Sequence, residues 1–134
     1  MAYGSVLTDV VQSSVTGTPP QFNDGAGTQT GTLCRAWVNF DGTAGSPTPR
    51  ASFNITSITK GSTGTYVLNL TNAMTDANGA SVGSAIPGTA SSTNSNRYVS
   101  TAVIATNQIR VNVCDVSSAS TFDDSAYINI AVFR

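Results

Sequence analysis

The acidic side chains are the first candidates for chemistry, and all seven of them are aspartates. The chain has no histidine and no glutamate, so the commonest general base and metal ligand is missing. Asp41 and Asp76 are the two carboxylates that a fold could bring together, as a glycosidase requires. Most of the aspartates stand at predicted turns, where the side chain bonds its own backbone. Turn roles explain both residues, and we predict that the protein is not an enzyme.

A cation site and an activated nucleophile are the remaining chemical possibilities. Asp115, Asp123 and Asp124 offer oxygen ligands to calcium, but they lack the Asp-x-Asp-x-Asp-Gly spacing of a dedicated loop. No Gly-x-Ser-x-Gly elbow, phosphate-binding loop or metal-type cysteine spacing occurs. The single lysine, Lys60, falls in a predicted hairpin turn, where we expect it to be solvated. We therefore predict no catalytic residue, no metal and no cofactor.

The cysteines and the overall charge limit the environment and the partners. Two cysteines, Cys34 and Cys114, do not make a disulfide framework in a chain of 134 residues. We expect two reduced thiols packed as small apolar side chains, with a disulfide or a reactive thiol as the alternative. A net charge of −1 without a basic run gives little attraction for nucleic acid. No apolar run approaches a membrane span and no signal peptide is visible, so we expect synthesis in the cytoplasm.

Apolar and polar residues alternate along most of the chain, which is the period of β-strands. In residues 33–40 the alternation puts Val38 and Phe40 on one face and Trp37 on the other. Ile58 breaks the alternation, which indicates a bulge or the end of a strand. Strands are predicted at 33–40, 51–58, 64–71, 108–114 and 126–133, with weaker ones at 5–11, 80–86 and 97–105. No stretch has a convincing helical stripe.

About eight short strands separated by turn residues predict an all-β fold, an antiparallel β-sandwich of jelly-roll or Greek-key type. Residues 1–31 would form an N-terminal strand and an irregular docking arm, and residues 32–134 the sandwich, in a single structural domain overall. Seven residues are predicted to be structural, in the core or at a subunit interface: Trp37, Phe40, Phe53, Tyr66, Leu68, Ile128 and Ile130.

Several predicted strands are apolar on both faces, as Trp37 opposite Phe40 shows. A lone two-sheet sandwich needs only one buried face per sheet. The second apolar set therefore predicts a partner subunit and a homo-oligomer. We interpret Trp37 as a packing residue, with Arg35 lying over an aromatic ring.

Two runs carry a resemblance to a known family: "CRAWVNFDGT" from Cys34, and "ASFNITSITKGSTGTYVLNLTNAMTDANGA" from Ala51 to Ala80. They resemble a C-terminal module of bacteriophage tail-fibre and tail-fibre-like virion proteins. That module has an Arg-Ala-Trp-Val-Asn-Phe strand, then Ala-Ser-Phe/Tyr-Asn-x-x-Ser-Ile-Thr and a Gly-Thr-Gly-type hairpin. This chain departs from the pattern at "AGSPTPR" and after Ala80. The resemblance implies a mostly β virion protein, typically a homotrimer, with no catalytic residues.

Two functions from different classes fit this resemblance. The first is a fibre or fibre-like adhesin whose loops bind a host surface glycan or protein. Its candidate receptor-binding residues are of types that stack on sugars or hydrogen-bond to them: Asn94, Asn96, Arg97 and Tyr98. The alternative is that these residues form an ordinary solvated loop. The second is a capsid decoration or cement protein whose arm at 12–27 reaches across capsid subunits. Other virion proteins are partners in both cases. A polysaccharide-degrading spike, the third hypothesis, would need a carboxylate pair.

Overall fold

The structure is a computed structural model that describes residues 21–23, 28–30, 34–88, 97–116 and 121–134. The chain divides into two units, one that precedes Cys34 and one that runs from Cys34 to Arg134. In the first unit β1 (Gln21–Asn23) pairs antiparallel with β2 (Thr28–Thr30), within the stretch that was expected to be irregular. The predicted strand at 5–11 lies outside the described residues.

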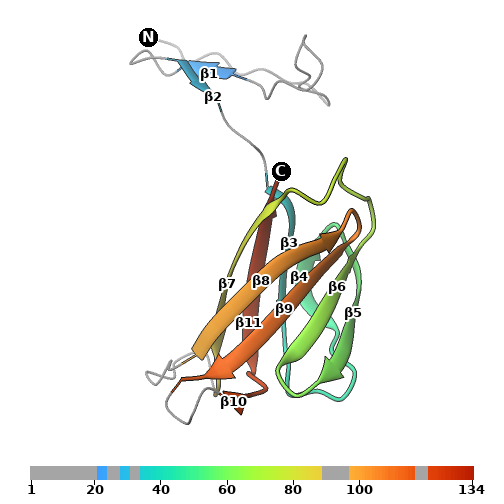
Figure 1. Cartoon of the computed structure of the whole chain (residues 1–134), viewed down its shortest axis with the longest axis vertical. Coiled ribbons are helices and arrows are strands. Elements are labelled where there is room, and N and C mark those ends of the chain that lie inside the picture. The colour runs from blue at the N-terminus through green and yellow to red at the C-terminus, as the bar shows by residue number, and fades with distance from the viewer. Residues whose placement is uncertain (1–20, 24–27, 31–33, 89–96, 117–120) are drawn as a thin grey trace, which may run out of the picture. The chain divides into compact units, whose positions relative to one another are not determined.

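The second unit is an antiparallel β-sandwich of two sheets that lie face to face (Figure 1). The order in the four-stranded sheet is β4 (Pro49–Phe53), β3 (Cys34–Phe40), β11 (Tyr127–Phe133) and β7 (Ala80–Ile86). The other sheet comprises β8 (Arg97–Ala105), β9 (Gln108–Asp115), β6 (Thr65–Leu70) and β5 (Ile55–Ser62), with the short β10 (Thr121–Phe122) pairing with the end of β9. This is the fold class expected from the sequence. The predicted ranges in this unit, 51–58 excepted, match the observed strands to within one residue.

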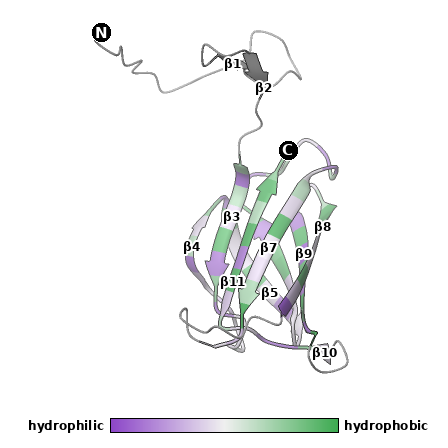
Figure 2. Ribbon diagram, turned by 90° about the vertical axis from the view of Figure 1, so that its left-hand side faces the viewer, coloured by the Kyte–Doolittle hydropathy of each residue, from purple (hydrophilic) through white to green (hydrophobic). Residues whose placement is uncertain are grey.

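The core lies between the two sheets and is filled mainly by inward side chains of β3, β5, β6, β7, β9 and β11. Figure 2 shows hydrophobic and hydrophilic residues alternating along β3 and β11. The ring of Phe40 in β3 packs edge-on against that of Tyr66 in β6, with centroids 5.2 Å apart and an interplanar angle of 74°. Five of the residues predicted to be structural are buried here: Phe40, Tyr66, Leu68, Ile128 and Ile130.

The chain crosses from one sheet to the other at Asn54, between β4 and β5. Asn54 has a φ of 58°, in the left-handed region that asparagine tolerates better than most residues. Its side-chain amide donates to two backbone carbonyls, and its Oδ1 accepts a hydrogen bond from the backbone N–H of Asn72 at 2.7 Å. Because of this crossing, residues 51–58 form parts of two strands rather than one. The break in alternation at Ile58 also follows a register irregularity within β5, between Ile55 and Ser57, which agrees with the bulge that was one of the two expectations.

The two sheets approach closely at Gly83 in β7. A Cβ atom at this position would lie 2.6 Å from Cδ1 of Ile130 and 2.9 Å from Cγ1 of Val99. Both distances are shorter than real Cβ contacts, so a larger residue would push β7 away from the core. Because side chains alternate along a strand, the inward position of Gly83 sends its neighbours Val82 and Ser84 to the outer face.

A polar cluster of Lys60, Asp124 and Tyr66 joins the β5–β6 hairpin to two segments that are distant in the chain, those of Gly42 and Asp124. Lys60 Nζ donates to Asp124 Oδ2 at 2.6 Å and to the carbonyl oxygen of Gly42 at 2.8 Å. Asp124 Oδ1 accepts hydrogen bonds from the Tyr66 hydroxyl at 2.6 Å and from the backbone N–H of Gly64 at 2.8 Å. The expectation of a solvated Lys60 in a turn is wrong, because Lys60 lies within β5 and its side chain is only 16% exposed.

The titration of the cluster follows from its burial and its hydrogen bonds. Burial raises the pKa of Tyr66, and the hydrogen bond to Asp124 raises it further, so the phenol stays protonated. Burial by itself would raise the pKa of Asp124. The hydrogen bonds from Gly64, Lys60 and Tyr66 outweigh that effect and hold the pKa of this carboxyl below its ordinary value. The cluster therefore contains an ionised carboxylate that accepts a hydrogen bond from a neutral hydroxyl.

Replacing Asp124 by alanine should remove the acceptor that the cluster shares. Lys60 and Tyr66 would stay largely buried without it, so the free energy of unfolding should fall by roughly 2–3 kcal/mol. Asp41→Ala is the matched control, because Asp41 pairs with Arg50 at an exposed site where the loss should be at most about 1 kcal/mol. Urea denaturation followed by circular dichroism measures both losses. Equal losses in the two variants would contradict this role of the cluster.

Acid should destabilise the sandwich over a defined range of pH. In the folded protein the pKa of Asp124 lies below 3.8, and a hydrogen bond from Arg134 lowers the pKa of Asp76 to about 2. As the pH falls, the unfolded chain therefore binds protons at these carboxyls before the folded protein does. Their stabilising contribution is present above about pH 5 and is lost as the pH falls from about 4 to about 2. Urea midpoints measured between neutral pH and pH 2 should show this decline; a level profile would refute it.

Candidate binding surfaces

The carboxylates considered for glycosidase chemistry are far apart. Asp41 Oδ2 lies 3.0 Å from Nη2 of Arg50, and Asp76 pairs with Arg134. Arg50 lies over the ring of Tyr127 at the start of β11, whereas Arg134 follows the end of that strand. A strand of this length spans roughly 20 Å, so the two carboxylates stand near opposite ends of the sheet. The structure does not form the Asp41–Asp76 pair.

The described part of the chain contains no group of three or more side chains of the types that hold a metal, and no helix long and apolar enough to cross a membrane. Two of the three suggested calcium ligands, Asp115 and Asp123, form ion pairs with Arg97. Cys34 and Cys114 are free thiols and belong to different sheets, on β3 and β9.

Of the four residues predicted to bind a receptor, the structure describes two, Arg97 and Tyr98. Asn94 and Asn96 lie outside the described residues. Arg97 is the first residue of β8, and its side chain is only 10% exposed because it forms the two ion pairs just described. Arg97 therefore ties β8 to the adjacent β9–β10 segment, and its role in receptor binding stays a prediction. Tyr98 points outward and is 59% exposed.

Tyr98 belongs to an exposed apolar row on the five-stranded sheet. The strand register pairs Tyr98 with Cys114 of β9, and Cys114 with Phe122 of β10. Both rings are more than half exposed, as is the nearby Val116. Clustered large apolar side chains at the surface mark a contact with another molecule more often than scattered ones do.

The outer face of the four-stranded sheet carries a second apolar row. Trp37 is 42% exposed and Phe53 is 54% exposed, so neither residue lies in the core. That they lie at a subunit interface, the other position expected for them, stays a prediction. Alternation along β3 sends Trp37 outward because its neighbours Ala36 and Val38 point into the core. The register places four residues side by side on the four strands: Phe53, Trp37, Ala131 and Val82.

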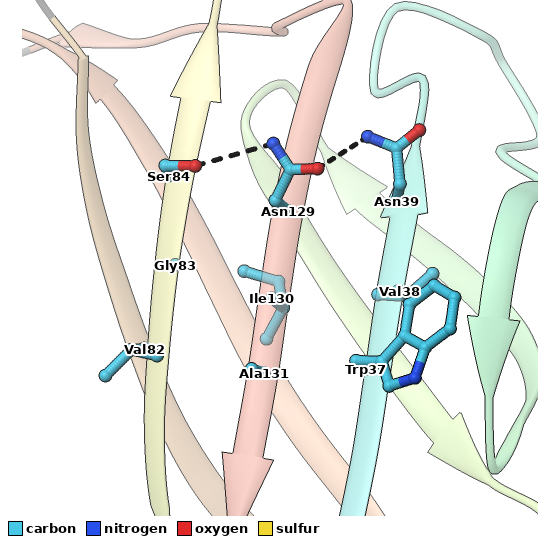
Figure 3. Close-up of a pocket in the computed structure, with 9 residues that line it drawn as sticks. All are labelled: Trp37, Val38, Asn39, Val82, Gly83, Ser84, Asn129, Ile130 and Ala131. Carbon is cyan, nitrogen blue, oxygen red and sulfur yellow. Dashed lines mark hydrogen bonds between the residues drawn. The ribbon is translucent and has the colours of Figure 1, made fainter. Parts of the chain in front are cut away.

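A polar row runs parallel to this apolar row, two residues further along the strands. Asn39 Nδ2 donates to Asn129 Oδ1 at 2.6 Å, and Asn129 Nδ2 donates to Ser84 Oγ at 3.4 Å (Figure 3). A side-chain amide has two N–H donors and a carbonyl oxygen with two lone pairs. The internal bonds of the row therefore fix the amides in place and leave part of their hydrogen-bonding capacity available.

An open groove of about 480 Å³ lies over these rows. Trp37 stands on one side of it and Val82 on the other, with the small side chain of Ala131 between them and Asn129 further along β11 (Figure 3). The volume falls within the range of small-molecule sites, roughly 300–1,000 Å³. None of the nine lining residues is charged. The groove can therefore offer stacking, apolar contact and neutral hydrogen bonds.

The sequence analysis missed the polar row. Alternation does put Asn39 and Asn129 on the outward faces of their strands, but it does not reveal that β3 and β11 are neighbours. Two cations lie over aromatic rings in the described residues, Arg50 and Lys60, and Arg35 is not one of them. The structure places Arg50 over Tyr127, at 4.3 Å from the ring centroid, where Arg35 was expected over a ring.

Comparisons of the chain with protein-family models, with curated proteins and with solved structures found no match. The class of the protein is therefore defined by its architecture. It is an all-β sandwich with exposed aromatic rows on both sheets and an uncharged groove on one of them.

Trp37→Ala should cost little stability, because a partly exposed side chain gives up only part of its transfer free energy. We expect a loss of about 1–2 kcal/mol in the free energy of unfolding. Phe40→Ala is the matched control, since it empties a fully buried site on the same strand and should cost about 3–5 kcal/mol. Guanidinium denaturation followed by circular dichroism compares them. A loss for Trp37→Ala as large as that for Phe40→Ala would contradict the exposed position.

Proposed function

We propose that the chain is a non-enzymatic structural protein of a bacteriophage virion, a tail fibre or fibre-like adhesin that contributes to host attachment. The observation that carries the proposal is the exposed aromatic pair of Trp37 and Phe53. Trp37 belongs to "RAWVNF" and Phe53 to "ASFN", the two runs that open the resemblance to the tail-fibre module. Their strands are neighbours, and the register sets the two residues opposite each other. The residues that resemble the family thus build an outward-facing surface.

The use of charge in the chain supports an extracellular structural role. All five aspartates in the described residues form ion pairs with arginine or lysine. Three of these pairs tie a loop to a strand, and the remaining polar surface is rich in Ser, Thr and Asn. A weakly charged surface responds little to changes of ionic strength. Such a particle component would be made in the bacterial cytoplasm and would act on the assembled virion, in contact with other virion proteins.

A homotrimer is part of the proposal, since the resemblance implies one. The exposed row of Tyr98 and Phe122 is the surface we assign to subunit contacts. Packing these rings against a second copy would remove apolar surface from water. Such burial stabilises a contact by about 25 cal/mol of free energy for each Å². This assignment leaves the four-stranded sheet free to face a ligand.

A capsid decoration or cement protein is the second candidate. The division of the chain at Cys34 favours it, because the preceding unit has the length of an arm that could contact neighbouring capsid subunits. The sandwich would then cover the capsid surface instead of a receptor.

Light scattering and labelled electron microscopy test these proposals together. The purified full chain should have three times the mass of 13.7 kDa, and Tyr98→Ala should shift it toward the monomer. Val67→Ala, at an outward position on β6, is the matched control and should leave the trimer intact. Gold-labelled antibody should mark the tail of the phage that encodes the chain. Label on the capsid would instead establish the cement role, and virions without label would overturn both.

A further inference from the structure

The groove over β3, β11 and β7 combines chemical features that a purely apolar contact does not need. Its one aromatic wall, the indole of Trp37, stands beside a row of hydrogen-bonded amides on the same sheet face (Figure 3). We propose that this groove binds a neutral sugar ring of a surface glycan. The inference rests on the proposed adhesin function and assigns the ligand class to a site outside the predicted receptor loop.

The first step of the argument is the shape of the groove. A pyranose ring has a flat face of C–H groups, which packs against an aromatic ring while its hydroxyls point sideways. Trp37 and Val82 form two sides, and the single methyl group of Ala131 between them leaves room for a ring to enter. Phe53, next to Trp37 on β4, extends the aromatic surface for a second sugar.

The second step is the polar row. Three hydrogen-bonding side chains lie on adjacent strands, so the row from Asn39 through Asn129 to Ser84 spans roughly 10 Å. An amide presents a donor and an acceptor together, which is the pattern that two neighbouring hydroxyls require. The bonds within the row hold the amides before a ligand arrives, which lowers the entropic cost of binding.

The third step is charge. The residues that line the groove include no acid and no base, so nothing in it would balance a carboxylate or a phosphate. An anionic group in the groove would find no charged partner among the residues that line it. The ligand class is therefore neutral hexoses and N-acetylhexosamines rather than sialylated or phosphorylated glycans.

A second copy of the chain is the competing occupant of this face. The copy would also bury Trp37, but it would cover the amide row with apolar side chains unless matching donors met it. Free sugar hydroxyls satisfy amides without such matching. The amide row therefore favours the glycan, and a contact between copies becomes an outcome of the experiment.

Trp37 is the chain's single tryptophan, so its fluorescence reports directly on the groove. The full chain should be titrated with neutral oligosaccharides of mannose, galactose, glucose and N-acetylglucosamine, and with sialyllactose as the charged comparison. At least one neutral probe should change the emission saturably, and sialyllactose should do so more weakly than lactose. No response to any neutral probe would overturn the inference.

Three variants locate the response within the groove. Asn129→Ala should weaken binding at least tenfold, and Ala131→Leu, which fills the groove without removing a polar group, should abolish it. Asn69→Ala is the matched control, because Asn69 donates to Ser57 and Thr59 on the outer face of the other sheet. It should leave the affinity unchanged. Equal affinities for all three variants would show that sugars bind elsewhere.

Two further results keep this inference separate from the proposed function. Emission that shifts to the blue with rising protein concentration and ignores every sugar would assign the face to a second copy and overturn the glycan site. If the labelled chain coats host cells and the Ala131→Leu variant coats them equally, the adhesin function is supported and the glycan site in the groove is refuted. If the neutral sugars bind in the groove but virions carry no label, the glycan site is supported and the virion role is refuted.

Discussion

The central position of β11 is the constraint on which the sandwich depends. This strand is the last in the chain, yet it lies between β3 and β7 in the middle of the four-stranded sheet. Its inward residues Ile128, Ile130 and Val132 are buried in the core. Its outward residues Asn129 and Ala131 join the rows on the other face. One strand therefore completes both the core and the groove, and a shift of its register by one residue would exchange the two.

Polar contacts fix the segment that leads into β11. Asp124 is held by Lys60 and Tyr66. The carbonyl of Ser125 accepts a hydrogen bond from the backbone N–H of Gly42 at 2.9 Å, and that of Ala126 accepts one from Arg50 at 2.7 Å. These partly buried charges and hydrogen bonds resist the loss of any one partner, because the group left behind would be buried without compensation. Here they set where β11 begins, and through the register they set the outer rows.

Local patterns in the sequence were enough to predict the strands, and the reason is physical. Alternation of polar and apolar residues specifies which residues of a strand share a face, so Val38 and Phe40 were correctly placed on the face opposite Trp37. Lys60 was misplaced because its partners, Gly42 and Asp124, come from other parts of the chain and no local signal announces them. The same limit applies to the groove. Its amides lie on β3 and β11, which are far apart in the sequence and become neighbours only in the folded sheet.

The way the chain uses its charges bears on what the free surfaces can recognise. Four of the six basic residues are engaged by aspartates within the sandwich, as Arg97 illustrates with its two carboxylate partners. Charges that are neutralised within the fold contribute little to long-range steering of a ligand. Recognition is left to short-range chemistry, in which Trp37 supplies a flat apolar face and Asn129 supplies neutral donors and acceptors. A surface of that composition would discriminate by the shape and hydroxyl pattern of a partner rather than by its charge, as the proposed role on a virion requires when ionic strength varies.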